Sequence, residues 1–166
     1  MTTSLRDLAD IVSVLYSSYM NRSKGGPDGK PLDLMDLLHT AYAAQAEVEA
    51  QLGTVGLSLA KLHALQALAD AGGSVPLGQL AERLACVKSN ITQLVDRLEA
   101  DGFVARESDP TDRRTRLAVL TATGRKACAE GTRLHEESER TLLKGLTRDE
   151  AHQLGALLEK VGRPRS

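Results

Sequence analysis

Aromatic side chains are scarce in this sequence of 166 residues, which contains one Phe, three Tyr and no Trp. The apolar fraction of 42% therefore consists mainly of Leu, Ala and Val. Because Leu and Ala favour helices, we expect a fold that is mainly α-helical. The same scarcity argues against a pocket in which aromatic rings stack on a planar ligand.

Cysteine, charge of a single sign and long apolar runs are also lacking. Two cysteines, Cys86 and Cys128, cannot form a disulfide framework, so we expect a reducing compartment, the cytoplasm. We find neither a signal-peptide pattern nor an apolar run of about 18 residues, so we expect no membrane partner. The net charge of −1 means that a nucleic-acid partner would require locally placed cations.

Periodic apolar residues divide the chain into helices separated by breaks rich in turn-forming residues. Residues 1–30 read as an amphipathic arm with a linker, and residues 31–56 carry a long helix. Ser58 is typical of a residue that caps the next helix. A long helix begins again at Thr121, and residues 147–150 form a capping box for the last one.

Between residues 57 and 120 the predicted order is three helices followed by a β-hairpin. The third helix buries a stripe from Ile91 to Leu98, and the hairpin turns at residues 109–112. This order describes a winged helix-turn-helix, which places its second short helix in the major groove of DNA and its hairpin against the backbone. The predicted fold class is therefore mainly α with a small β-hairpin wing.

The face opposite that apolar stripe consists of polar, hydrogen-bonding residues: Lys88, Ser89, Asn90, Thr92, Gln93 and Arg97. Asn and Gln can pair with adenine through two hydrogen bonds, and Lys can contact guanine or phosphate. A helix that is merely solvated more often alternates Glu and Lys. The pattern favours base contacts, with an ordinary polar surface as the alternative.

Three arginines, Arg113, Arg114 and Arg116, lie within four residues at the predicted hairpin tip. Arginine suits a narrow minor groove, where the potential is most negative, and Asp112 could hold one guanidinium in place. Seven basic and seven acidic residues nevertheless balance between residues 82 and 116. The alternative is therefore a loop whose charges neutralise one another.

Residues 102–124 include Gly-Phe-Val-Ala-Arg, Asp-Pro-Thr-Asp-Arg-Arg and Leu-Thr-Ala-Thr-Gly, in that order. This stretch resembles the wing signature of the multiple antibiotic resistance regulator (MarR) family. Residues 91–99, Ile-Thr-Gln-Leu-Val-Asp-Arg-Leu-Glu, resemble the recognition helix of that family. The resemblance is close over residues 57–125, and residues 1–30 lie outside it.

The resemblance implies a transcriptional repressor that acts as a homodimer and binds a pseudo-palindromic operator in double-stranded DNA. Residues 31–56 and 121–166 would then form the dimerisation helices, on either side of a DNA-binding domain of residues 57–120. The family's Asp-x-Arg element falls on Asp112 and Arg114, which makes Arg114 the expected minor-groove residue.

Two positions depart from the family pattern. Val87 stands where many members have a small hydroxyl residue at the start of the recognition helix, so we expect a weaker cap, with Ser89 as a substitute. Gln93 stands where many members have Arg, which removes a cation and alters the expected base preference.

Family members often respond to small phenolic or lipophilic ligands, for which His39, Tyr42 and His63 are the candidate pocket residues here. Each of the three is more often an ordinary packing or surface residue. Some relatives sense oxidants through a cysteine, and Cys86 is the candidate because its modification would disturb the recognition helix. An inert thiol is the default interpretation of both cysteines. We expect such a signal to release the DNA.

Enzymatic chemistry has little support in the sequence. The four histidines are far apart, which gives no metal-ligand spacing, and neither a nucleophile elbow nor a phosphate loop is present. We therefore expect no metal, no cofactor and no catalysis. The main alternative is a winged-helix protein-interaction module that has lost DNA binding, which the neutral net charge leaves open.

Overall fold

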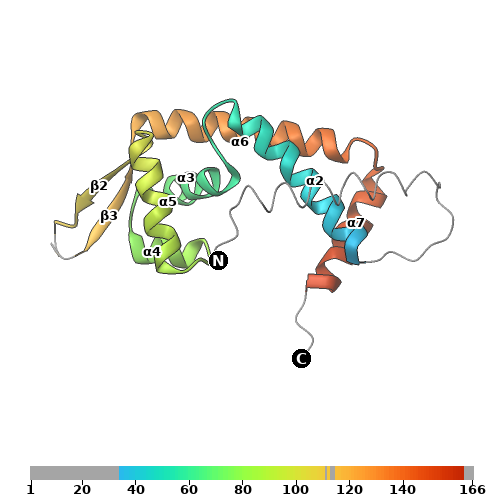
Figure 1. Cartoon of the computed structure of the whole chain (residues 1–166), viewed down its shortest axis with the longest axis horizontal. Helices are drawn as coiled ribbons and strands as arrows, with labels where there is room; N and C mark the ends of the chain where they lie inside the picture. The colour runs from blue at the N-terminus through green and yellow to red at the C-terminus, as the bar shows by residue number, and fades with distance from the viewer. Residues whose placement is uncertain (1–33, 111, 113–114, 163–166) are drawn as a thin grey trace, which may run out of the picture. The chain divides into compact units, whose positions relative to one another are not determined.

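The computed structural model describes residues 34–110, 112 and 115–162, so the predicted arm of residues 1–30 lies outside the described part. The elements in chain order are α2 (Leu34–Gly53), α3 (Leu59–Asp70), β1 (Ser74–Pro76), α4 (Leu77–Arg83), α5 (Lys88–Ala100), β2 (Val104–Ser108), β3 (Arg116–Leu120), α6 (Ala122–Leu143) and α7 (Arg148–Gly162) (Figure 1). The chain divides into two compact units, residues 1–44 and 45–166, so α2 contributes to both.

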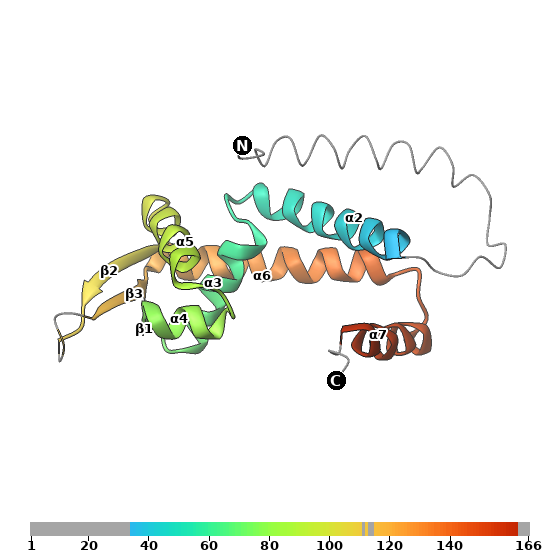
Figure 2. The same cartoon turned by 60° about the horizontal axis from the view of Figure 1, so that its bottom comes forward.

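The three strands form one antiparallel sheet in the order β1-β3-β2. Val104 pairs with Leu120 at one end of the β2–β3 hairpin and Ser108 pairs with Arg116 at the other. This hairpin, the predicted wing, extends beyond α3, α4 and α5 (Figures 1 and 2). The strand β1, which the sequence pattern did not predict, adds a third strand against β3 by pairing Val75 with Ala118.

The core of the second unit forms where α3 meets α4, α5 and the sheet. Its largest fully buried side chains are Leu52, Leu62, Leu65, Leu68, Leu80, Ile91, Val95 and Leu98. The helix α6 packs against α3, and Gly131 of α6 lets these two helices approach closely. A Cβ added at Gly131 would lie 2.6 Å from Leu57 Cδ1 and 2.9 Å from Leu62 Cδ1. The helix α5 and the wing therefore pack on a tightly packed base.

Several helix boundaries match the sequence prediction. The Ser58 hydroxyl accepts a hydrogen bond from Lys61 N at 3.3 Å, and the Thr121 hydroxyl accepts one from Gly124 N at 2.9 Å. Gly102 has a φ of 74°, a left-handed conformation that favours glycine and ends α5. These caps fix where the helices on both sides of the wing begin and end.

The last helix begins with the predicted capping box. Glu150 Oε2 accepts hydrogen bonds from the backbone N of Thr147 at 2.8 Å and from the Thr147 hydroxyl at 2.7 Å. These bonds lower the pKa of Glu150. Beyond this box, α7 exposes an apolar stripe of Leu154, Leu157, Leu158 and Val161. No helix within the described ranges combines the length and apolar content needed to cross a bilayer.

Candidate nucleic-acid interface

The helix α5 presents one buried and one exposed face, as its sequence pattern predicts. Ile91, Val95 and Leu98 are at most 1% exposed. The opposite face carries exposed, hydrogen-bonding side chains: Ser89, Asn90, Thr92, Gln93 and Arg97. We call these five residues the reading face. Lys88 begins the helix, but its side chain lies outside the described part.

The start of α5 differs from the expectation in one respect. Val87 is the N-cap residue, with extended backbone angles and no side-chain hydrogen bond. Ser89 does not replace it, because Ser89 already lies inside the helix and its hydroxyl is 3.5 Å from Asn90 Oδ1. A cap needs a residue just outside the helix, whose side chain can turn back to the first N–H groups. The expectation that Ser89 substitutes for the cap is therefore wrong.

A cluster of ion pairs ties the C-terminal half of α5 to the wing. Arg106 of β2 contacts Asp96 Oδ1 through Nη2 at 2.5 Å and Glu99 Oε2 through Nη1 at 3.2 Å. Its Nη2 also donates to the carbonyl oxygen of Thr92 at 3.3 Å, and its backbone N donates to Glu99 Oε1 at 3.2 Å. One strand residue thus contacts α5 at three points along the helix.

A second ion pair ties the end of α5 to α3. Lys61 Nζ lies 2.7 Å from Asp101 Oδ2 and also donates to the carbonyl oxygen of Gly56 at 3.1 Å. Asp101 is the C-cap residue of α5, just before Gly102. Three acids of residues 82–116 therefore form ion pairs within the chain: Asp96, Glu99 and Asp101. Because Lys61 lies outside residues 82–116, the balanced charge count of that stretch overstates the negative charge that a DNA phosphate would meet.

Sequence reasoning did not identify Arg106 or Lys61 as parts of the interface. The only signal was the spacing of Asp96 and Glu99, which puts two acids on one side of a helix. Their partner comes from another element, and no local pattern names it.

The wing tip is built around two aspartates. The side chain of Asp109 accepts the backbone N–H of Asp112 at 3.3 Å, and Asp112 Oδ2 accepts the hydroxyl of Thr115 at 3.0 Å. Arg116, at the base of the tip, donates to Ser108 Oγ at 3.0 Å. Residues 113 and 114 lie outside the described residues. The minor-groove role of Arg114 and the orienting role of Asp112 stay predictions.

A cleft of about 510 Å³ opens between α3 and the recognition helix. Its lining combines apolar and polar side chains: Ala60, His63, Leu84, Cys86, Asn90, Gln93, Leu94 and Arg97. The candidate effector residue His63 and the candidate redox residue Cys86 thus share a cleft with three residues of the reading face. His39 and Tyr42 precede Ala44 in the other unit, so their grouping with His63 stays a prediction.

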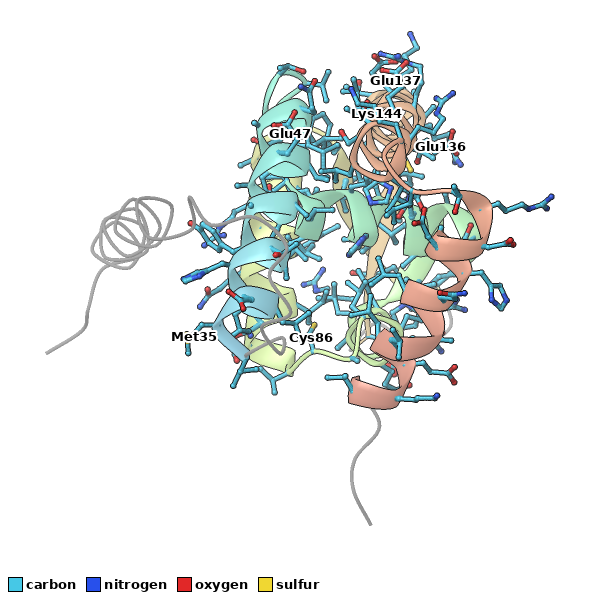
Figure 3. The ribbon with its side chains drawn as sticks, turned by 90° about the vertical axis from the view of Figure 1, so that its right-hand side faces the viewer. Met35, Glu47, Cys86, Glu136, Glu137 and Lys144 are labelled. Atoms are coloured by element: carbon cyan, nitrogen blue, oxygen red, sulfur yellow. The ribbon has the colours of Figure 1, made fainter. Side chains whose placement is uncertain are left out.

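The two thiols have different surroundings. Cys86 is half-buried in the turn before α5, where it borders the cleft (Figure 3). Cys128 is buried in α6, and this burial raises the pKa of its thiol, an effect that a hydrogen bond with Thr132 partly opposes. Among the described residues, no group of three or more His, Cys, Asp or Glu side chains could hold a metal ion.

The sequence profile of the MarR family matches residues 55–115. The HTH-type transcriptional regulator YkoM of Bacillus subtilis is 38% identical over 90 residues, which span 54% of this chain and 58% of YkoM. The HTH-type transcriptional regulator YcgE of the same organism is 33% identical over 125 residues, or 75% of each chain. The chain belongs to the MarR family of DNA-binding transcriptional regulators.

Solved structures agree with this membership. A mutant of MarR from E. coli, complexed with operator DNA, matches this MarR-family chain with a TM-score of 0.68 and 26% identity, over 78% of this chain and 94% of that one. BpsR of Bordetella bronchiseptica, whose DNA binding is regulated by 6-hydroxynicotinic acid, matches with a TM-score of 0.64 and 26% identity, over 76% and 96%. The predicted winged-helix fold class is therefore confirmed.

Proposed function

We propose that this MarR-family chain is a repressor that binds a pseudo-palindromic operator in double-stranded DNA as a homodimer. The observation that carries the proposal is the reading face of α5. It exposes amide, hydroxyl and guanidinium groups, while the acids of the same helix are paired with Arg106 and Lys61. The side chains of Gln93 and Arg97 make no hydrogen bond or ion pair within the described residues, so both are available to a ligand.

In this proposal, the two parts of the interface have separate tasks. The reading face, with Lys88, contacts base edges and sets sequence preference. The wing arginines Arg113, Arg114 and Arg116 contact phosphates and the minor groove, and supply most of the affinity.

The exposed apolar residues near the C-terminus support the homodimer. Leu142, Leu143 and Leu146 follow the charged stretch of α6, in which Glu136 and Glu137 point outward (Figure 3). The stripe of α7 adds further exposed apolar side chains, and its Leu157 is 57% exposed. A second copy of the chain would remove these side chains from water. Two winged domains related by a twofold axis suit a pseudo-palindromic operator.

The cleft between α3 and α5 supports control by a small ligand. An occupant would contact Asn90, Gln93 and Arg97, three residues proposed to read DNA, and would thus favour a DNA-free state. The regulation of BpsR by 6-hydroxynicotinic acid provides a precedent in a relative. Modification of Cys86 in the same cleft is the redox alternative.

A salt-titrated binding assay tests the DNA proposal. Fluorescently labelled duplexes that tile the region upstream of the protein's own gene are compared with a scrambled duplex from about 50 to 200 mM salt, a range over which phosphate contacts weaken strongly. We expect one duplex to bind preferentially, with affinity that falls as salt rises. Binding that ignores salt, or no binding to any duplex, would favour the protein-interaction module instead.

Two variants separate the tasks of the helix and the wing. Arg114→Ala should weaken binding to all duplexes and lower the salt slope by about 1, whereas Gln93→Ala should change the order of preference among them. Arg140→Ala, which removes an exposed arginine from α6, is the control for loss of a positive charge. If Arg114→Ala binds like the control, the role of the wing is wrong.

A further inference from the structure

We propose that Arg106 is a positioning residue that fixes the angle between α5 and the wing, so that discrimination between DNA sequences depends on it. The inference rests on the proposed DNA-reading function of α5. It assigns to Arg106 no contact with DNA. Its task is to hold the two DNA-contacting elements in one relative orientation.

The contacts of Arg106 follow the length of α5. Thr92, Asp96 and Glu99 are spaced four and three residues apart, so they lie on one side of successive helical turns. A planar guanidinium with a fixed fork of donors is suited to bind several acceptors at once. Because the contacts are spread along the helix, they restrict its tilt as well as its distance from β2.

The connection between α5 and β2 is short. Gly102 has a positive φ, and Phe103 N donates to the carbonyl oxygen of Leu98 at 2.9 Å. This turn holds one end of the strand, and the contacts of Arg106 hold it again farther along. Two fixed points define the direction of β2 relative to α5, and the pairing of β2 with β3 extends that direction to the rest of the wing.

The length of the wing amplifies small errors in that direction. Arg106 pairs with Ala118 in the middle of the hairpin, and Asp112 at the tip is six residues further along the chain. The paired part of the hairpin reaches three residues beyond Arg106, to Asp109, whose backbone N donates to the carbonyl oxygen of Thr115 at 3.1 Å. At about 3.3 Å per residue, that end lies roughly 10 Å from Arg106, so a pivot of about 10° would move it by about 1.7 Å, and the tip beyond it by more. Such a movement exceeds the tolerance of a hydrogen bond. The wing and the reading face would then no longer fit the same DNA site together.

The positive charge of Arg106 is already compensated by two carboxylates of the same chain. Its side chain is 26% exposed and lies between two carboxylates, whose side chains are 53% and 40% exposed. A guanidinium paired in this way contributes little attraction for phosphate. This separates the proposal from the simpler view that Arg106 is one more cation of the DNA-binding surface.

The test compares three single substitutions in the full-length chain. Arg106→Gln removes the contacts from the wing side, and Asp96→Asn weakens them from the helix side. Lys61→Gln is the matched control, because it also breaks an ion pair to α5 but leaves the wing unaffected. For each variant, affinity is measured for the preferred duplex of the upstream region and for the scrambled duplex, with salt slopes and Tm.

We expect Arg106→Gln to lose about tenfold or more in affinity for the preferred duplex, comparable with one mismatched base pair, and less than about threefold for the scrambled duplex. Its salt slope should match that of the unmodified chain. Asp96→Asn makes the protein more positive, so charge attraction alone predicts tighter binding, whereas the positioning role predicts weaker binding to the preferred duplex. Lys61→Gln should lower Tm but preserve the ratio of the two affinities.

Two results would overturn the inference. If Arg106→Gln weakens both duplexes equally and lowers the salt slope by about 1, Arg106 is a phosphate contact. If Asp96→Asn tightens both duplexes, the pair does not position the wing, and this result stands even if Arg106→Gln fails to fold. A chain that does not distinguish the two duplexes before substitution would instead overturn the proposed function, and with it the basis of this inference.

Discussion

Cys86 and Cys128 show how the surroundings of a residue decide its chemistry. Cys86 borders a cleft beside the reading face, whereas Cys128 packs in the core, where it is 7% exposed. Burial in an apolar region disfavours the thiolate, which is the reactive form of cysteine. The inert interpretation therefore fits Cys128, and Cys86 is the better-placed candidate for modification.

Burial of Cys128 predicts a loss of stability at high pH. Its thiol has a folded-state pKa above the ordinary value of 9.0. Below about pH 9.0, the thiol is protonated in both the folded and the unfolded chain. Above that pH, the unfolded chain releases the proton first. The free energy of unfolding therefore falls as pH rises toward the folded-state pKa.

Urea unfolding at about pH 8 and about pH 10, under reducing conditions, measures this loss. Cys128→Ala should reduce stability at both pH values by loss of packing, but its free energy of unfolding should fall less between them. The thiol accounts for at most about 1.4 kcal/mol of that fall for every tenfold decrease in proton concentration. If the free energy of unfolding falls equally for the unmodified chain and for Cys128→Ala between these pH values, the prediction is contradicted.

At the residue scale, the sequence predicted which side chains are exposed better than it predicted their ion-pair partners. The alternation of apolar and polar positions in α5 correctly separated Ile91 and Val95 from the reading face. The partners of Asp96 and Glu99 could not be predicted, because Arg106 reaches them only after α5 and β2 have folded against each other. A charge count adds up such groups without showing which of them pair with one another.

At the element scale, the junction between the wing and α6 depends on a glycine. A Cβ added at Gly124 would overlap the carbonyl oxygen of Phe103. That oxygen already accepts hydrogen bonds from the backbone N and the hydroxyl of Thr121, each at 3.1 Å. The first turn of α6 therefore lies directly against the start of the wing, where only glycine fits.

Gly124→Ala should lower the free energy of unfolding by about 1–3 kcal/mol, because the methyl group displaces well-packed backbone. Gly155→Ala is the matched control: a Cβ at this position in α7 meets nothing within 4 Å. There, the higher helix propensity of Ala should stabilise the protein by about 0.5–1 kcal/mol. Chemical denaturation of both variants measures the difference, and equal effects would show that the junction tolerates a side chain.

Elements with a periodic pattern, which include the short α4 and both strands of the wing, were predictable from the sequence, as were the capped helix ends, whereas β1 was not. The strand β1 has three residues, too few for an alternating pattern, and it ends in Pro76, which cannot donate to a sheet. It forms because β3 offers an unpaired edge, which includes the backbone N of Leu120 that donates to Gly73 O at 2.7 Å. Tertiary pairing, not local preference, decides this strand.

At the scale of the whole molecule, the proposed dimer depends on apolar side chains of α7. Leu157→Glu would place a charge within the proposed interface, where burial without a partner is costly. We expect the dimer dissociation constant to rise by about 100-fold or more, which corresponds to about 3 kcal/mol. Binding to the pseudo-palindromic duplex should weaken in parallel, because one winged domain would act alone.

Sedimentation velocity over a range of protein concentrations measures this change. Gln153→Glu adds the same charge to an exposed polar position of the same helix, and it should leave the dimer intact. If Leu157→Glu sediments like Gln153→Glu, the stripe on α7 is not the dimer contact.

The internal pairing of the acids on α5 bears on how the protein would search a genome. Attraction to arbitrary DNA grows with the number of phosphates a protein neutralises, and this chain carries a net charge of −1. A protein whose cations are partly held in ion pairs of its own, as Arg106 and Lys61 are here, spends short periods on unrelated sequence and returns quickly to solution. Most copies would then remain unbound and able to reach the correct site. A cell would need only a small number of molecules to keep one promoter occupied.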